Sequence, residues 1–534
     1  MNWFQVFYTK LKKQTIMAIS RWQLVNGYGL AAILLTSLFL DLNSSRGCTI
    51  GAFSYLSTRS RCPILWKNRD IANPDQAVYY FTDGQYRYLG LVYANDSTRV
   101  WAGINEKGFA IINSNSYNIG SGASNGPDDG ELMKIALQRC ASIGEFQEIL
   151  DSTNLTGRTV PANFGVFDST GEATIFEAGA YQYQRFDATK ESLGFILRAN
   201  FSMSGDSARR TGYARYLRAM ELVKSGYQDT SLDAQYIFSK VARDIGGPDF
   251  NPYPLPFQDT FGSYPYGFLP TTASINRYRT RACVVLIGKA KSSILTRLGA
   301  NPSDSKMRNL NNLNHFERFE QFGLTMWTIL GEPCIGIPLP LILDAQSVPK
   351  ELSGPGLPKI CALTKSIRDY VYCGSDFGVN TFLLANIQKV ILPLETEIFK
   401  RTEEKLNLWQ TDLPKASEVL GFEESLAQCV VECYDKLLFN EKNSLPLQQL
   451  KIKIYPNPAR KSVTIKGLPK STVSKINVYD SQGRRVDEIK FRAGYPVKWL
   501  PKNLKPGTYF LILEPEPAKT WTKFLYLSNR QSRF

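Results

Sequence analysis

An apolar run near the N-terminus, Gly29–Leu40, decides which part of this chain is available to fold as a domain. The run is about 12 residues long, whereas a membrane-spanning helix needs about 20. Basic residues precede the run, and small residues occupy the −3 and −1 positions of a cut after Gly47. We therefore predict that residues 1–47 are a signal peptide and that the folded protein begins at Cys48. One alternative is an uncleaved anchor. Another is a lipoprotein acylated at Cys48, but Ser45-Arg46-Gly47 is a poor lipobox.

The positive charge of the chain is concentrated at its ends. The 534 residues include 63 Lys+Arg and 48 Asp+Glu, a formal net charge of +15. Residues 451–534 carry +13 and residues 1–47 carry +4, which leaves −2 for residues 48–450. The charge therefore predicts no nucleic-acid partner for the main part of the chain. With 43% hydrophobic residues, general disorder is excluded, and the length predicts two to four domains.

The chain has a single histidine, His315, in a polar run that is typical of the protein surface. Zinc sites built from several histidines are therefore excluded. A serine–histidine–aspartate triad would have to use His315 as its histidine. We expect catalysis, if present, to use another base. No metal or organic cofactor is implied.

An N-terminal cysteine would supply such a base. Its free α-amine has a pKa near 7.7–8 and can accept the proton of its own thiol. Residues 49–56 and 63–71 alternate as two strands of a β-hairpin. If the turn centres on Arg59, Cys48 lies opposite Asp70, on the same face of the sheet, and Asp70 can orient the amine. Alternatively, Asp70 only ends a strand.

Several segments, taken in order, resemble one superfamily. The chain is similar to the N-terminal-nucleophile cysteine amide hydrolases, which include the choloylglycine hydrolase and penicillin V acylase group and the isopenicillin N acyltransferase-like group, the latter being closer. The resemblance implies an α+β fold of four αββα layers and cleavage of linear amide C–N bonds. The matching segments are residues 48–51, 65–70, 103–109, 113–115, 163–168, 171–177, 195–200 and 214–218.

The resemblance also implies roles for individual residues. The expected catalytic set is Cys48 as nucleophile, Asp70 as the carboxylate at its amine, Asn115 and Asn200 at the oxyanion hole, and Arg215 beside the nucleophile. Asn113 replaces Asn115 if the register shifts by two residues.

Position 67 departs from the choloylglycine hydrolases, which carry arginine three residues before the aspartate. This chain has Lys67, which keeps the charge but lacks the planar fork of arginine. The difference favours the acyltransferase-like group and weakens any prediction of bile-salt specificity.

Residues 451–534 have a different composition, with short alternating strands and Gly, Pro and Asn turns. This pattern predicts a small all-β, immunoglobulin-like sandwich. The segments Tyr455–Ala459 and Leu504–Phe510 resemble the C-terminal sorting domains of the type IX secretion system. A carbohydrate- or wall-binding sandwich is the alternative.

The predicted domains are a signal peptide (1–47), an amide hydrolase domain (48–400), a helical extension and linker (401–450) and the sorting domain (451–534). We expect export to the periplasm followed by secretion or attachment to the cell surface. The expected partners are a small N-acyl amide substrate and the type IX machinery, with no nucleic acid and no membrane span in the mature protein. The alternatives are a choloylglycine hydrolase or penicillin V acylase proper, a related dipeptidase, and an inactive surface-binding protein.

Overall fold

The computed structural model describes residues 47–289 except 263 and 265, then 323–372, 378–409, 412–439 and parts of 453–526. The predicted signal peptide up to residue 46, His315 and the linker 440–450 lie outside the described residues. None of the helices in these ranges is both long and apolar enough to cross a membrane.

A six-stranded antiparallel sheet contains the strand that follows Cys48. Nearly all of its side chains are buried, as expected for a sheet that is covered on both faces. Its strands in spatial order are β10 (Phe195–Arg198), β1 (Thr49–Phe53), β2 (Ile64–Asp70), β12 (Thr280–Ile287), β13 (Thr325–Ile329) and β14 (Leu339–Ile342).

A seven-stranded sheet is a meander in which each strand pairs with the next along the chain. Such short connections make the order of the strands in space follow their order in the sequence. The strands are β3 (Gln76–Phe81), β4 (Tyr88–Tyr93), β5 (Ala102–Asn105), β6 (Ala110–Asn115), β7 (Ala162–Phe167), β8 (Ala173–Ala178) and β9 (Tyr183–Asp187).

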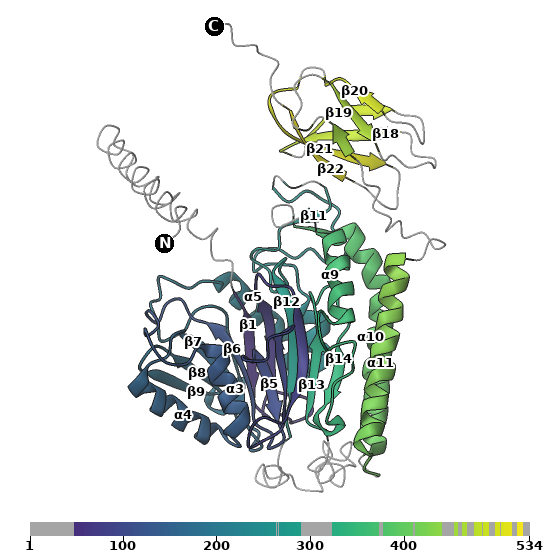
Figure 1. The fold of residues 1–534 in the computed structure, drawn as a ribbon. Coiled ribbons are helices and arrows are strands. Elements are labelled where there is room, and N and C mark those ends of the chain that lie inside the picture. The colour runs from purple at the N-terminus through teal and green to yellow at the C-terminus, as the bar shows by residue number, and fades with distance from the viewer. Residues whose placement is uncertain are drawn as a thin grey trace, which may run out of the picture. The chain divides into compact units, whose positions relative to one another are not determined.

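Helices α3 (Asp129–Arg139) and α4 (Ile143–Thr156) are inserted between β6 and β7 and cover one face of this sheet (Figure 1). Both begin with a capping box, formed by Asp128 with Glu131 and by Ser142 with Glu145. In a capping box two backbone N–H groups are satisfied reciprocally, which sets where each helix starts.

The two sheets share one hydrophobic core. Residues of β1 and β2, such as Ile50 and Leu65, belong to the same buried cluster as Ile104 of β5 and Ile112 of β6. Helix α5 (Tyr213–Gln228) packs against β10, and the mixed α+β class is therefore confirmed. The finer description as four αββα layers stays a prediction.

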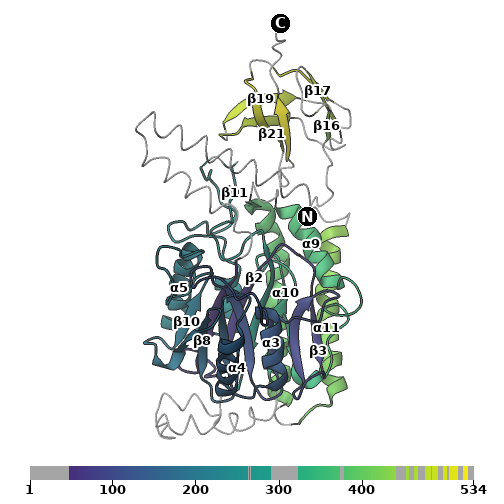
Figure 2. The same cartoon turned by 60° about the vertical axis from the view of Figure 1, so that its left-hand side comes forward.

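Two long helices, α10 (Thr381–Trp409) and α11 (Ala416–Phe439), lie along the edge of the six-stranded sheet near β14 (Figures 1 and 2). The predicted boundary at residue 400 falls inside α10, and buried side chains on both sides of it, Ile398 and Trp409, belong to the core of the two sheets. A sequence shows which face of a helix is apolar, but it does not show which sheet that face packs against.

The remaining elements are helix α9 and several short ones. They are η2 (Ala188–Lys190), α6 (Ala234–Tyr236), η3 (Ile237–Ala242), β11 (Phe268–Leu269), η4 (Leu343–Ala345), α9 (Lys359–Val371) and β15 (Val379–Asn380).

The C-terminal segment is all-β, as predicted. It has two antiparallel sheets, and side chains of both, such as Ile465 and Val478, form one separate cluster. The strands are β16 (Lys453–Tyr455), β17 (Val463–Lys466) and β20 (Val497–Trp499) in one sheet, and β19 (Arg485–Lys490), β18 (Lys475–Asp480), β21 (Gly507–Glu514) and β22 (Trp521–Tyr526) in the other. The immunoglobulin-like description stays a prediction.

The packing of α10 gives a test of where the catalytic body ends. Ile398 is 0% exposed, and Ile398→Ala is expected to lower the free energy of unfolding by about 2–5 kcal/mol because it leaves a cavity in the core. Leu408 on the same helix is 56% exposed, and Leu408→Ala should change stability by less than about 0.5 kcal/mol. Urea unfolding of both variants measures the difference, and equal effects would contradict the assignment of α10 to the core.

Candidate active site

Cys48 lies directly before β1, which is an inner strand between β10 and β2. Its side chain is only 7% exposed, and the chain upstream of it continues through Gly47, which is also buried. The strand that follows Cys48 is paired on both sides, with β2 from Thr49 onward and with β10 from Ile50 onward. Cys48 is therefore in a fixed position from which a reactive side chain could act.

The pairing of β1 with β2 differs by one residue from the predicted register. Thr49 pairs with Asn68, so the alignment places Cys48 opposite Arg69 and not opposite Asp70. Because successive side chains alternate between faces, the side chains of Cys48 and Asp70 leave the sheet on opposite faces. The prediction that they share a face is wrong.

The physical reason is the length of the turn. The connection between the strands, residues 54–63, has an even number of residues, so its centre lies between Thr58 and Arg59 and not on Arg59. Asp70 is instead opposite Gly47, whose N–H lies 3.4 Å from the Asp70 carbonyl oxygen. This contact uses the Asp70 backbone, whereas the Asp70 carboxylate contacts Thr280, Arg277 and Arg215. No hydrogen bond joins Asp70 to Cys48 in this part of the structure, so its contact with the amine stays a prediction.

The Asp70 carboxylate is buried and held by three groups. Thr280 donates its hydroxyl to Oδ1 at 2.7 Å, Arg277 donates from Nη1 to Oδ2 at 3.2 Å, and Arg215 Nη1 lies 3.8 Å from Oδ2. Burial raises the pKa of Asp70, while Arg277 and Arg215 oppose that shift.

Arg277 and Thr280 are site residues that the sequence analysis missed. Thr280 is the first residue of a recognisable strand, and Arg277 precedes it in a loop. Both are more than 200 positions from Asp70, and only the pairing of β12 with β2 brings them together. The only feature of the sequence that pointed to Thr280 and Arg277 was their position at the start of a predicted strand, because residues at strand ends often line a site.

Arg215 is buried, which excludes a position on a solvated helix face. Its Nη1 donates to the Cys48 carbonyl at 2.8 Å, to the Thr49 hydroxyl at 2.8 Å and to the Gly47 carbonyl at 3.3 Å. Burial, and then the neighbouring Arg277, lower the pKa of Arg215 to about 10. Arg215 thus holds the backbone on both sides of the Gly47–Cys48 peptide bond.

The start of α5 leaves room for this guanidinium only because residue 212 is glycine. Gly212 has φ of +80°, and a Cβ at this position would lie 2.3 Å from Arg215 Nη2. The left-handed backbone and the close approach both require glycine.

Asn200 is oriented by Arg215. Arg215 Nη2 donates to Asn200 Oδ1 at 2.7 Å, so the Asn200 amide must direct its Nδ2 the other way, where it donates to the Asn115 carbonyl at 3.0 Å. The structure therefore brings Asn115 and Asn200 together, but the contact uses the Asn115 backbone. The second N–H of Asn200 Nδ2 is available to another acceptor.

Asn113, the alternative to Asn115, is engaged elsewhere. Its Oδ1 accepts a hydrogen bond from Lys67 Nζ, and its Nδ2 donates to Asp129 Oδ2 at 2.6 Å. Burial lowers the pKa of Lys67 to about 8, and Lys67 and Cys48 interact electrostatically. Burial likewise raises the pKa of Asp129.

Cations outnumber anions around Cys48. The thiol interacts electrostatically with Lys67, Arg69 and Arg215. Arg69 lies over the Trp101 ring at 4.2 Å and has no carboxylate partner among the described ion pairs. Negative charge that develops on sulfur or on a bound carbonyl oxygen would be stabilised in such a site.

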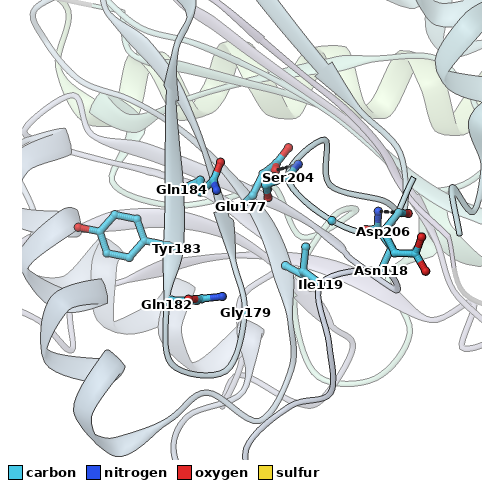
Figure 3. A pocket seen from close by; sticks show the side chains of 10 residues that line it. Asn118, Ile119, Glu177, Gly179, Gln182, Tyr183, Gln184, Ser204 and Asp206 are labelled. Atoms are coloured by element: carbon cyan, nitrogen blue, oxygen red, sulfur yellow. Dashed lines mark hydrogen bonds between the residues drawn. The ribbon is translucent and has the colours of Figure 1, made fainter. Parts of the chain in front are cut away.

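A cavity of about 330 Å³ lies beside these loops (Figure 3). It is lined by Asn118, which follows Asn115 in the chain, by Ser204 and Asp206, which follow Asn200, and by Glu177 of β8. None of the five predicted site residues lines it. It is therefore a neighbour of the candidate site and not the site itself.

The C-terminal segment matches a known family. Residues 453–526 match the model of the "Secretion system C-terminal sorting domain". This tail is a secretion-system sorting domain. The prediction for the segment is thus confirmed, and a sorting domain indicates export and interaction with a secretion machinery. The preceding residues lie outside this match, and no curated protein matches the chain in sequence.

Solved structures to which the chain is similar include a bile acid hydrolase and a penicillin V acylase. Two variants of conjugated bile acid hydrolase from Clostridium perfringens match with TM-scores of 0.27 and identities of 13% and 14%, over 35% of this chain and 76% and 77% of those chains. Penicillin V acylase from Agrobacterium tumefaciens matches with a TM-score of 0.34 and 12% identity, over 55% of this chain and 86% of that chain.

The buried Lys67 predicts a pH dependence of stability. Its pKa is about 8 in the folded chain and 10.5 ordinarily, so unfolding takes up a proton between these pH values and stability rises with pH. The cost of burying the ammonium is present below pH 8 and relieved by pH 10.5. Relative to Lys67→Met, the free energy of unfolding should rise by up to about 3 kcal/mol over this range. Urea unfolding at several pH values measures it, and a constant difference between the two proteins would contradict the assignment.

Proposed function

We propose that this chain is an exported cysteine N-terminal-nucleophile enzyme that cleaves, or transfers the acyl group of, linear N-acyl amides. The observation that carries the proposal is the set of contacts around residue 48. Arg215 bonds the Cys48 backbone and Asn200, and it lies beside Asp70. These residues come from four separate segments of the chain. An ion pair with a purely structural role would not require all four segments to meet beside a cysteine.

The proposed reaction begins after removal of residues 1–47, when the α-amine of Cys48 is free. The amine accepts the thiol proton, and the sulfur attacks the substrate carbonyl carbon. The tetrahedral intermediate collapses to a thioester as the amine product leaves with the proton. Water, or a second amine in a transferase, then attacks the thioester, gives up a proton to the α-amine and restores the thiol.

The negative oxygen of each tetrahedral intermediate needs donors. Asn200 Nδ2 has one N–H free, and its orientation is set by Arg215. We assign the second donor to Asn115, which lies at the partly exposed end of β6. The Asn113 amide is an unsuitable donor because Lys67 and Asp129 already engage it.

Asp70 has a positioning role in this proposal. Its carboxylate is fixed by Thr280 and Arg277, and it lies at the level of the Gly47–Cys48 junction. After the cut, the new amine replaces the Cys48 peptide nitrogen, and a fixed carboxylate beside it would hold the ammonium form and direct its proton.

The C-terminal sorting domain supports the proposal that the enzyme is exported. A signal peptide would direct the chain to the periplasm, and the C-terminal domain would engage the type IX machinery for secretion or surface attachment. Leader and tail together carry +17, and the rest of the chain carries −2. The working enzyme would then be a nearly neutral protein.

The cut before Cys48 is the first test. Mass spectrometry of the exported protein should find Cys48 at its N-terminus, and Cys48→Ala should reduce hydrolysis of N-acyl amino acids or penicillin V to background because no nucleophile remains. Cys62→Ala, at another buried cysteine, is the matched control and should retain activity. An intact Gly47–Cys48 bond in active protein, or full activity of Cys48→Ala, would refute the mechanism.

The oxyanion assignment predicts a change in rate and not in binding. Asn200→Ala should lower kcat by about 10²–10³-fold with little change in KM, because the lost hydrogen bond forms in the transition state. Asn118→Ala removes a buried amide that holds the neighbouring Ser202 and Asp206 loop and should leave kcat within a few-fold. Steady-state kinetics on both variants decides the point, and equal losses would assign Asn200 a structural role.

A further inference from the structure

Arg210 lies on a short loop that touches the candidate site. The next residue, Thr211, accepts the backbone N–H of Asn200 at 3.2 Å, and Gly212 then packs against the Arg215 guanidinium. Arg210 is thus one residue away from a direct contact with the proposed oxyanion donor.

Two aromatic rings hold the Arg210 side chain. Its guanidinium carbon lies 5.8 Å from the Phe201 ring centre and 5.5 Å from that of Tyr213. The rings are packed against each other at 5.9 Å, and both pack against Tyr216. Tyr213 is 39% exposed, so this cluster reaches the surface beside Asn200. Arginine stacked on aromatic rings is oriented but keeps its N–H groups available.

The Arg210 guanidinium has no anionic partner in the described part of the chain. Its Nε is buried without a hydrogen-bond partner. Neighbouring arginines differ: Arg209 pairs with Asp206 at 3.5 Å, Arg198 with Glu177 at 2.6 Å and Arg218 with Asp244 at 2.9 Å. The nearby carboxylates are therefore already taken, and Arg210 is left to bind an anion from outside the chain.

The charge of the site points the same way. Asp70 is shared by two arginines, Arg215 and Arg277, and so cannot neutralise both. A substrate that brings a negative charge would be attracted to this site, and Arg210, in the loop that contacts Asn200, could offer it a planar, bidentate donor.

Resting on the proposed function, we propose that Arg210 is a specificity-determining residue that binds a carboxylate on the amine half of the substrate. The substrate class is then the N-acyl amino acids, in which the carboxylate carbon is two bonds from the scissile nitrogen. An amide of the same shape with a neutral carboxamide would lack this contact.

The test compares two matched substrates, N-phenylacetylglycine and N-phenylacetylglycinamide, on the exported protein. The unmodified enzyme should prefer the acid by at least about tenfold in kcat/KM, and Arg210→Met should abolish the preference by slowing only the acid. Arg210→Lys should keep part of it. Arg209→Met, the matched control, removes an exposed arginine already paired with Asp206 and should keep all of it.

Two outcomes would overturn the inference: no preference for the acid in the unmodified enzyme, or the same preference in Arg210→Met. If the enzyme hydrolyses neither substrate, the proposed function fails separately. Calorimetric binding of N-phenylacetylglycine to the same proteins then decides the role of Arg210. Binding at least about tenfold weaker in Arg210→Met than in Arg209→Met supports the carboxylate contact, and equal binding refutes it. Thermal unfolding of Arg210→Met and Arg210→Lys checks that both are folded.

Discussion

The candidate site depends on one buried side chain, the Arg215 guanidinium. It joins helix α5 to the backbone at Cys48, to the Asn200 amide and to the Asp70 carboxylate. A buried arginine is costly unless its N–H groups are satisfied, and each of these contacts contributes to satisfying it. The same hydrogen bonds that stabilise the ion therefore place three predicted site residues around the start of β1. Arg277 completes the arrangement by sharing Asp70, so that the pocket keeps an excess of positive charge.

The alternation of β2 separates two sets of charged groups. Lys67 and Arg69 leave the strand on the face of Cys48, toward Asn113 of the second sheet, whereas Asp70 leaves on the face of Thr280 and Arg215. A cysteine at the end of β1 is thereby surrounded by cations on the side of its thiol and by a fixed carboxylate on the side of its backbone. This division suits a residue whose sulfur must carry negative charge and whose nitrogen must carry positive charge.

The sequence was most informative where an interaction is local. The hairpin of β1 and β2 and the all-β tail follow from patterns within a few residues. The register of that hairpin was predicted one residue wrong because a turn of ten residues does not define its own centre. Arg277 and Thr280 could not be predicted from spacing, since β12 reaches β2 only through the completed sheet. The predicted boundary at 400 lies inside helix α10, and the place of this helix in the core depends on the sheet beside it, which spacing does not show.

Arg210 and Arg215 show how position decides what an arginine does. Arg215 lies in the first turn of α5, and Arg210 lies five residues upstream, in the loop before the helix. Arg215 is buried and its hydrogen bonds are used within the chain, so it can only hold the site together. Arg210 is fixed by Phe201 and Tyr213 through contacts that use none of its N–H groups. The stacking on the two rings stabilises the guanidinium in one orientation and leaves its N–H groups for an anion that binds from outside.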